Sequence, residues 1–177
     1  MFAKTKKLLD KTLELLVTVS MAVLVLDVVW QVFTRYVLKN PSSWTEELAT
    51  FLMIWVGMLG ASVALNRGAH LGIDYFVSKL SPRKGLFVSL FVFAVTALFS
   101  LLVLVVGGIE LVIRILAPQQ VSPALGLKMG YVYLAIPISG FFLVFYSVEL
   151  FVETLVALIR GKVIEEPHDF ESAAAMD

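Results

Sequence analysis

The chain has 177 residues, of which 59% are hydrophobic and only 16% are charged. A soluble domain carries about 25% charged residues, so this composition excludes a water-soluble globular protein and indicates a chain that lies in lipid. The 14 basic and 14 acidic residues balance, which argues against nucleic acid as a partner. Without cysteine there is no disulfide, thiolate metal site or iron–sulfur cluster, and two histidines are too few to bind two haems in pairs.

Four apolar segments are each long enough to cross a bilayer core of about 30 Å, which takes about 20 residues. Because a spanning segment must satisfy its backbone hydrogen bonds internally, we expect these segments to be helices. We therefore predict an all-α integral membrane protein in which residues 1–177 form a single membrane domain. Its four transmembrane helices are expected at about residues 13–37, 45–66, 85–115 and 129–160.

The links between these helices differ in length and pattern. Residues 39–43 form a short link, so the first two helices should form a hairpin, with Ser43 as N-cap. Apolar residues at helical spacing predict a short amphipathic helix at about residues 70–81, either at the membrane interface or packed on the helices. The link at 117–128 should be irregular, and the acidic tail at about 163–177 should be disordered.

Lysine and arginine residues are shared unevenly between the two sides of this topology. Most of them fall in the N-terminal arm, in the link between the second and third helices, and just after the fourth helix. Positively charged residues favour the cytoplasmic side of a membrane. We therefore predict that both termini are cytoplasmic.

Polar residues inside the first predicted helix are functional hypotheses, because an ionisable group in a membrane is costly. Asp27, Gln31 and Arg35 lie four residues apart and share one face of that helix. This spacing favours a polar face turned toward a partner. The alternative is internal pairing, in which Arg35 forms an ion pair with Asp27 or Glu46.

Charged residues also lie in the third and fourth predicted helices. Glu110 and Arg114 have the spacing of an ion pair, so we expect mutual neutralisation rather than a proton carrier. Glu149 and Glu153 share one face of the fourth helix, and neutralisation by basic residues is favoured over a cation site. The basic residues available to these two glutamates are Lys7, Lys11 and Arg160.

Small residues and one proline shape the second and fourth predicted helices. The pairs Gly57/Ala61 and Gly60/Ala64 have the small-xxx-small spacing that permits close helix approach. Pro137 should bend the fourth helix and free the carbonyl of Tyr133. The sequence shows no internal repeat and no glycine- and serine-rich unwound segment at mid-membrane, so it favours a helper subunit over an autonomous transporter.

Two segments resemble motifs of a known family. SSWTEELATFLMIWVGMLGASVALNRGAHLGID has an aromatic-x-Glu-Glu entry to the second helix, then Gly-Ala, then basic, Gly, His and Asp residues. Its motif residues are Trp44, Glu46, Glu47, Gly60, Ala61, Arg67, Gly68, His70 and Asp74. The later segment PALGLKMGYVYLAIP, from Pro123 to Pro137, resembles the family's entry to the fourth helix. In these features the chain resembles the small membrane subunit (Q, or DctQ type) of tripartite ATP-independent periplasmic (TRAP) transporters.

The resemblance implies a role in a sodium-coupled transporter of the bacterial inner membrane that imports a carboxylate such as sialic acid or a C4-dicarboxylate. The implied partners are a large membrane subunit, which moves like an elevator, a periplasmic substrate-binding protein and membrane lipids. The small subunit would be the stator and would help to dock the binding protein, in a separate, unfused form. We expect no enzyme activity and no cofactor or metal in this chain, with sodium bound on the large subunit.

The resemblance and the residue patterns together assign three groups of residues. The predicted interface with the large subunit comprises Asp27, Gln31, Arg35, Gly57, Gly60, Ala61 and Ala64. The candidates for periplasmic docking are Trp44, Glu46 and Glu47. The alternative is that Trp44 is only an anchor at the membrane–water interface, and that the two glutamates are only first-turn residues favoured by the helix dipole. The predicted structural residues are Arg67, Gly68, His70, Asp74, Pro123 and Pro137, and His70 is not expected to bind a metal.

A small four-helix proton-coupled exporter that acts as a homodimer is the alternative function. It would need Glu110 or Asp27 unpaired near mid-membrane and facing a substrate cavity. A membrane enzyme is a third possibility, although the sequence shows no nucleophile–base or metal-ligand cluster.

Overall fold

The computed structural model describes residues 2–40, 42–67 and 82–160. The predicted amphipathic helix at 70–81 and the predicted tail at 163–177 lie outside these residues. Four helical stretches are long and apolar enough to cross a membrane, namely Lys6–Tyr36, Ser43–Asn66, Lys84–Leu116 and Met129–Arg160. The described residues form helices and a single isolated β-bridge, so the prediction of an all-α fold with four spanning helices is confirmed.

The first two helices form the predicted hairpin. α1 (Phe2–Tyr36) leads through a short link to α2 (Ser43–Asn66), whose N-cap is Ser42 and not the predicted Ser43. Ser42 has an extended backbone, and its carbonyl accepts a hydrogen bond of 2.8 Å from the Thr45 hydroxyl. This bond fixes the chain direction at the start of α2, one residue earlier than the sequence pattern indicated.

The third spanning helix is continuous but has three parts. α4 (Pro82–Phe99) passes into the π-helical segment η1 (Ser100–Gly107) and then into α5 (Gly108–Leu116). A π-helical stretch usually covers a single turn, so η1 is long for its kind, and the hydrophobic pattern of the sequence did not predict it.

The fourth spanning helix is interrupted near its start. α6 (Met129–Tyr133) ends at a turn at Leu134, and α7 (Ala135–Arg160) follows directly. Pro137 has no N–H to donate to the carbonyl of Tyr133, which removes one helical hydrogen bond beside this turn. The interruption therefore agrees with the predicted effect of Pro137.

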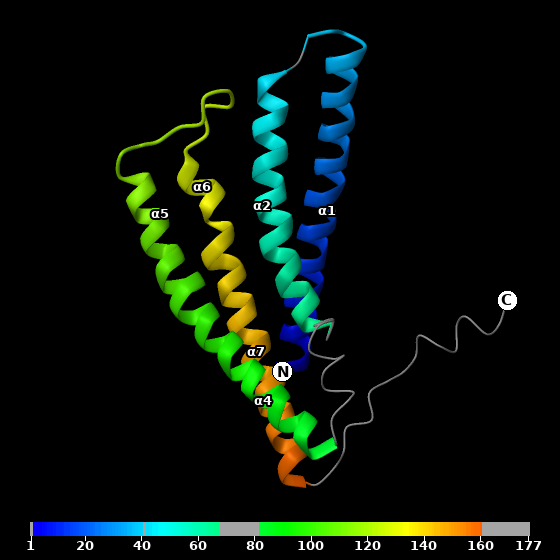
Figure 1. Ribbon diagram of the computed structural model, residues 1–177, viewed down its shortest axis with the longest axis vertical. Coiled ribbons are helices and arrows are strands. Elements are labelled where there is room, and N and C mark those ends of the chain that lie inside the picture. Colours follow the sequence, from blue (N-terminus) through cyan, green and yellow to red (C-terminus); the bar gives the residue numbers. More distant parts are fainter. Residues whose placement is uncertain (1, 41, 68–81, 161–177) are drawn as a thin grey trace, which may run out of the picture.

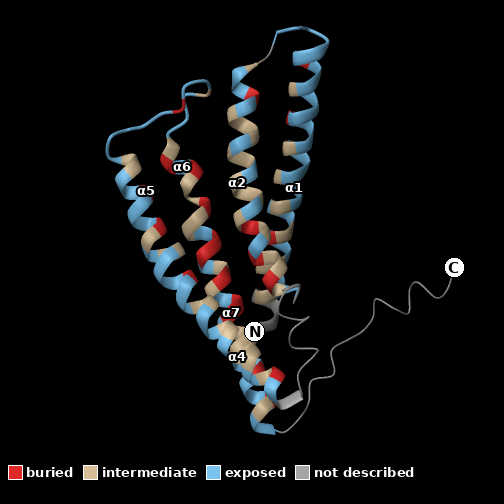
Figure 2. Ribbon diagram, viewed as in Figure 1, coloured by how far each residue is buried: buried red, intermediate tan, exposed pale blue. Residues whose placement is uncertain are grey.

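The four helices stand in a row rather than in a closed bundle (Figure 1). α1 packs on α2, α2 on α7, and α7 on α4 and η1, while α5 packs on α6. Each helix in a row keeps faces that no neighbour covers, so few side chains are deeply buried; Figure 2 shows most of α1 exposed. A row, unlike a closed bundle, does not surround a central space.

α1 faces its neighbour through a narrow stripe of less exposed residues. These positions recur alternately every four and three residues, the spacing of helices that coil around each other. The stripe comprises Leu13, Val17, Ser20, Leu24, Asp27, Gln31 and Thr34. Because α2 is the helix on which α1 packs, this stripe faces α2.

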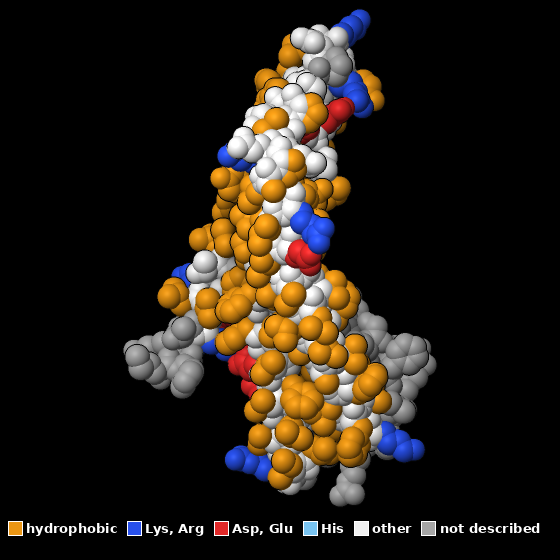
Figure 3. Space-filling view, turned by 90° about the vertical axis from the view of Figure 1, so that its left-hand side faces the viewer, with side chains coloured by type: hydrophobic (Ala, Val, Ile, Leu, Met, Phe, Trp, Pro, Cys, Tyr) orange, Lys and Arg blue, Asp and Glu red, His pale blue; other side chains and the backbone are white. Residues whose placement is uncertain are grey.

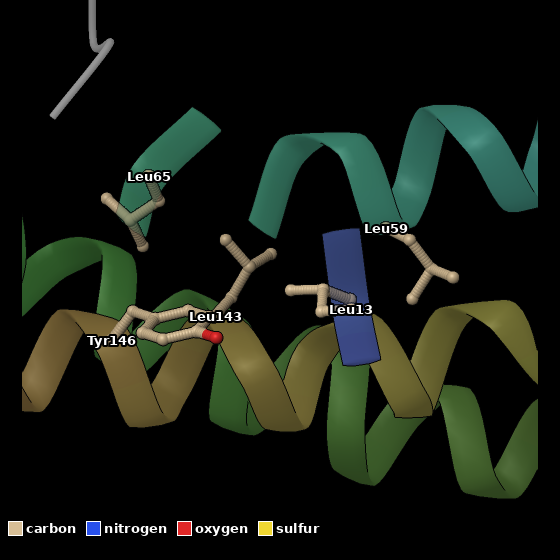
Figure 4. Close-up of a cluster of buried hydrophobic side chains, with 5 residues drawn as sticks. All are labelled: Leu13, Leu59, Leu65, Leu143 and Tyr146. Atoms are coloured by element: carbon tan, nitrogen blue, oxygen red, sulfur yellow. The ribbon is translucent and has the colours of Figure 1, made fainter. Parts of the chain in front are cut away.

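A small apolar core joins three of the helices where α1, α2 and α7 meet (Figure 4). It consists of Leu13 of α1, Leu59 and Leu65 of α2, and Leu143 and Tyr146 of α7. Beside it, the buried Ser62 hydroxyl donates a hydrogen bond of 3.2 Å to the carbonyl of Ser139, which links α2 directly to α7. Hydrophobic side chains cover most of the face shown in Figure 3, as expected of a surface in contact with lipid or a membrane partner.

Glycine lets α7 approach the third spanning helix closely. A Cβ at Gly140 would lie 2.7 Å from the Cβ of Leu104, and one at Gly108 would lie 3.1 Å from the Cδ of Pro137. These contacts hold η1 and α5 against the start of α7, so glycine is required there for packing.

Gly140→Ala should lower the thermal unfolding midpoint of the detergent-solubilised subunit. The added methyl group has no room beside Leu104, and overpacking of this kind costs about 1–3 kcal/mol. Gly57→Ala is the matched control, because a Cβ at Gly57 meets nothing within 4 Å. That control should leave the midpoint unchanged or slightly raised, and equal losses in both variants would contradict the packing argument.

Candidate functional site

The end of α1, the start of α2 and the 117–128 link lie at the same end of the molecule, which we call the loop end (Figure 1). The 117–128 link forms a compact loop in which the Ser122 amide donates to the Leu127 carbonyl at 2.8 Å and the Gly126 amide donates to the Ser122 carbonyl at 3.0 Å. Gly126 has a φ of 63°, which a residue without a Cβ adopts readily. The loop predicted to be irregular is therefore internally hydrogen-bonded.

Glu47 binds this loop from the first turns of α2. Its Oε1 accepts a hydrogen bond of 2.9 Å from the Ala124 amide, and its Oε2 accepts one of 2.9 Å from the Leu125 amide. The sequence suggested Glu47 as a docking residue but did not reveal this contact, because no spacing rule relates positions so far apart in the chain.

The other two docking candidates lie on the surface of the loop end. Glu46 pairs with Arg35 at 3.0 Å, and both side chains are about half exposed. This is one of the two pairings considered for Arg35, and such an exposed pair contributes little to stability. Trp44 is 43% exposed, so its ring is available to a partner or to lipid headgroups.

Asp27 and Gln31 lie on the stripe that faces α2, whereas Arg35 is exposed. Asp27 is only 7% exposed, and its Oδ2 has no hydrogen-bond partner among the described residues. The structure therefore separates Arg35 from the other two members of the predicted polar face. A contact of Asp27 or Gln31 with a partner subunit stays a prediction.

The two glycines of α2 have open space beside them within the described part of the chain. A Cβ at Gly57 or Gly60 would meet no atom of another element within 4 Å. Gly57 and Ala61 are exposed, and Gly60 and Ala64 are partly exposed. These four residues form an open small-residue face on α2.

Charged residues tie α1 to α2 and α7 at the end opposite the loops. Arg67 binds Glu14 through two contacts of 2.8 and 3.2 Å, and the Tyr146 hydroxyl donates to Asp10 at 2.7 Å. The sequence interpretation used neither Glu14 nor Asp10, although their spacing of four residues places both on one helix face.

Glu149 is neutralised by a basic residue, but not by one of those named from the sequence. The Nζ of Lys6 lies 2.6 Å from the Oε1 of Glu149. The prediction that Lys7, Lys11 or Arg160 would neutralise Glu149 was therefore wrong in its choice of partner. The predicted structural residues Gly68, His70 and Asp74 lie outside the described residues.

Glu110 and Arg114 form the expected ion pair, with nitrogen–oxygen distances of 2.5 and 3.0 Å. The exporter alternative needed an unpaired carboxylate that faces a substrate cavity. Glu110 is paired, and Asp27, which lacks a hydrogen-bond partner for Oδ2, faces α2. Within residues 2–40, 42–67 and 82–160, no group of three histidine or acidic side chains could hold a metal ion.

The two predicted structural prolines occupy different settings. Pro123 is exposed in the 117–128 loop, directly before the amides that Glu47 binds. Pro137 packs against Gly108 and marks the start of α7. Pro123 therefore lies in the link between the third and fourth spanning helices, and Pro137 lies within the fourth, beside its interruption at Leu134.

Known sequences show what the chain is similar to. The sequence model of the family described as the DctQ component of tripartite ATP-independent periplasmic transporters matches residues 24–157. The sialic acid TRAP transporter small permease protein SiaQ of Vibrio cholerae is 28% identical over 144 residues, which cover 81% of this chain and 82% of that protein. The C4-dicarboxylate TRAP transporter small permease protein DctQ of Rhodobacter capsulatus is 33% identical over 97 residues, 55% of this chain and 42% of that protein.

A third relative is the sialic acid TRAP transporter permease protein SiaT of Haemophilus influenzae. It is 43% identical over 74 residues, which cover 39% of this chain and 12% of that protein. The family is one of transporter membrane subunits and not of enzymes, and with four apolar helices the chain is a multi-pass protein of the bacterial inner membrane. The resemblance seen in the sequence is thus confirmed: the chain belongs to the DctQ-component family of TRAP transporters, as a small permease subunit.

Proposed function

We propose that this subunit is the fixed membrane scaffold of a sodium-coupled TRAP importer. Its large partner subunit would carry the substrate and sodium sites and the moving domain, and the small subunit would hold no cofactor. The substrate is a carboxylate, either sialic acid or a C4-dicarboxylate, since relatives with these two substrates in their names match the chain. The large membrane subunit is the natural partner, because part of the chain also matches a much longer permease protein.

The observation that carries the scaffold role is the open row of helices with its uncovered small-residue face. Glycine in a helix interior is destabilising by about 0.5–1 kcal/mol relative to alanine, so it needs a compensating close contact. At Gly140 and Gly108 that contact lies within the chain, but at Gly57 and Gly60 nothing lies within 4 Å. A helix of the large subunit would fill this space and make use of both glycines.

Asp27 supports the same role from α1. An unpaired charge near the middle of a membrane helix costs about 2.5–3.5 kcal/mol on insertion scales. Asp27 is buried at the α1–α2 contact, and its Oδ2 has no partner among the described residues, so a polar or basic group of the large subunit that enters the edge of this contact would stabilise it. Its contribution would then be to assembly and not to ion coupling.

The loop end is the proposed docking region for the periplasmic binding protein, with both termini in the cytoplasm. Exposed Trp44, the Arg35–Glu46 pair and the ordered 117–128 loop offer a soluble partner apolar, charged and backbone groups on one surface. Lipids would cover the remaining apolar faces of the row.

Reconstituted alone in liposomes with a sodium gradient, the subunit should take up neither sialic acid nor a C4-dicarboxylate. A row of helices surrounds no central site, so the substrate path must lie on the partner. Uptake should appear when the large subunit and the binding protein are added. Sodium-driven uptake by the small subunit alone would end the scaffold proposal.

Ala61→Leu should reduce co-purification of the large subunit. A larger side chain at a close helix contact costs about 1–3 kcal/mol, which corresponds to a loss of about fivefold or more in complex formation. Ala22→Leu makes the same chemical change at an exposed position of α1 outside the stripe and should have no effect. Equal co-purification of both variants would show that the small-residue face is not the interface.

Asp27→Asn should raise the thermal stability of the isolated subunit and lower that of the complex. The neutral side chain removes the cost of a buried charge, so the thermal midpoint of the isolated subunit should rise. The complex should lose its partner contact and melt at a lower temperature, while the number of sodium ions coupled to each substrate stays the same. A changed sodium stoichiometry in an intact complex would assign Asp27 to transport.

A further inference from the structure

We propose that Glu47 is a positioning residue, a clasp that holds two helical hairpins in one register at the loop end. The first is the α1–α2 hairpin, and the second is the α5–α6 hairpin with its 117–128 loop. The clasp would present both hairpins together to the periplasmic binding protein, so this inference rests on the docking role proposed above. Glu47 would then shape the docking surface without being part of it.

The two hairpins separate toward the loop end (Figure 1). Between α2 and the start of α6 lies an apolar cleft of about 260 Å³, lined by Leu52 and Trp55 on one side and by Leu127 and Tyr131 on the other. The buried core that joins α2 to α7 lies further along α2, from Leu59 onward. Side-chain packing at the loop end therefore holds the hairpins weakly, and the polar contact of Glu47 spans the gap.

The clasp uses the whole carboxylate. One oxygen accepts the Ala124 amide and the other accepts the Leu125 amide, each at 2.9 Å. Hydrogen bonds to an ionised acceptor are about twice as strong as neutral ones. Because both oxygens are engaged by the loop, Glu47 is poorly placed to bind a soluble partner directly.

The loop that receives the clasp is itself stiff enough to transmit position. Its backbone closes on itself through bonds from Ser122 to Leu127 and from Gly126 to Ser122, and Val121 and Lys128 form a β-bridge. Holding two consecutive amides therefore orients the whole loop. Exposed Val121 on the loop and exposed Trp44 on α2 then keep a defined separation.

The test compares Glu47→Gln with Glu46→Gln in the full complex. Both variants remove one negative charge from adjacent positions, but Glu46 bonds Arg35 within its own hairpin. Glutamine at position 47 keeps the length, yet its amide group has a single acceptor oxygen, so at least one of the two bonds is lost. The chain has no cysteine, so Val37→Cys and Gln120→Cys each provide a single site for a spin label, one on each hairpin. The large subunit in the labelled complex is a variant from which all cysteines have been removed.

We expect a narrow distance distribution between the labels in the wild type and in Glu46→Gln, and a broad one in Glu47→Gln. If the clasp is closed about a tenth of the time in Glu47→Gln, the binding-protein concentration for half-maximal uptake rises about tenfold. The maximal rate should stay unchanged, because the large subunit carries the transport steps. An unchanged distance distribution in Glu47→Gln, or an equal broadening of that distribution in Glu46→Gln, would overturn the proposal.

A covalent replacement distinguishes a lost clasp from misfolding. Glu47→Cys combined with Ala124→Cys, joined by a short bifunctional thiol reagent, should restore the half-maximal concentration toward the wild-type value. The same double variant without the reagent should behave like Glu47→Gln. Failure of the cross-link to restore docking would contradict the positioning role.

Trp44→Ala separates the clasp from the docking role on which it rests. Trp44 makes neither clasp bond, so its removal tests docking while the hairpins stay in register. A higher half-maximal concentration in Trp44→Ala but not in Glu47→Gln would uphold docking and overturn the clasp. A broadened distance distribution with no change of that concentration in either variant would show that the docking role itself fails.

Discussion

The contact between α2 and α7 holds the two halves of the described structure together. It joins the α1–α2 hairpin to the pair formed by the third and fourth spanning helices. A core of five side chains and the Ser62–Ser139 hydrogen bond hold them together at one level. The hydroxyl-to-carbonyl bond is suited to this place, because a buried polar group in a membrane protein needs a partner within the protein.

From that contact outward, the helices are held by polar ties at the two ends. At one end, Lys6, Arg67 and Tyr146 bind acidic groups on neighbouring helices. At the loop end, Glu47 reaches from α2 to the 117–128 loop. Exposed ion pairs contribute only modestly to the free energy of unfolding. These contacts therefore set the relative placement of the helices more than they stabilise the fold.

The row of helices explains why so much of the chain remains exposed. A closed bundle would turn one face of each helix inward, whereas a row covers only the edges where neighbours touch. The glycines show which contacts are made within the chain: Gly140 and Gly108 pack against neighbours, and Gly57 and Gly60 face open space. Such a surface suits a subunit that is completed by a larger membrane partner.

Much of the fold of this protein could be predicted from the sequence alone. The four membrane helices follow from uninterrupted apolar segments, since lipid leaves a spanning backbone no alternative to the helix. The break near Pro137 and the Glu110–Arg114 pair follow from local rules, because the missing N–H and the spacing of four residues act within one helix. The family could also be recognised from the motif between Ser42 and Asp74.

Only the tertiary structure decided which faces meet. The hydrophobic pattern of a membrane helix is nearly uniform around its axis, so it does not distinguish a lipid face from a helix face, and neither the row nor η1 could be predicted. The stripe that turns Asp27 and Gln31 toward α2 while leaving Arg35 outside depends on how two helices coil around each other. The partners of Glu47 and Glu149 lie far away in the sequence, where local spacing carries no information, so the docking candidate Glu47 was seen as a link between hairpins only once the chain was folded.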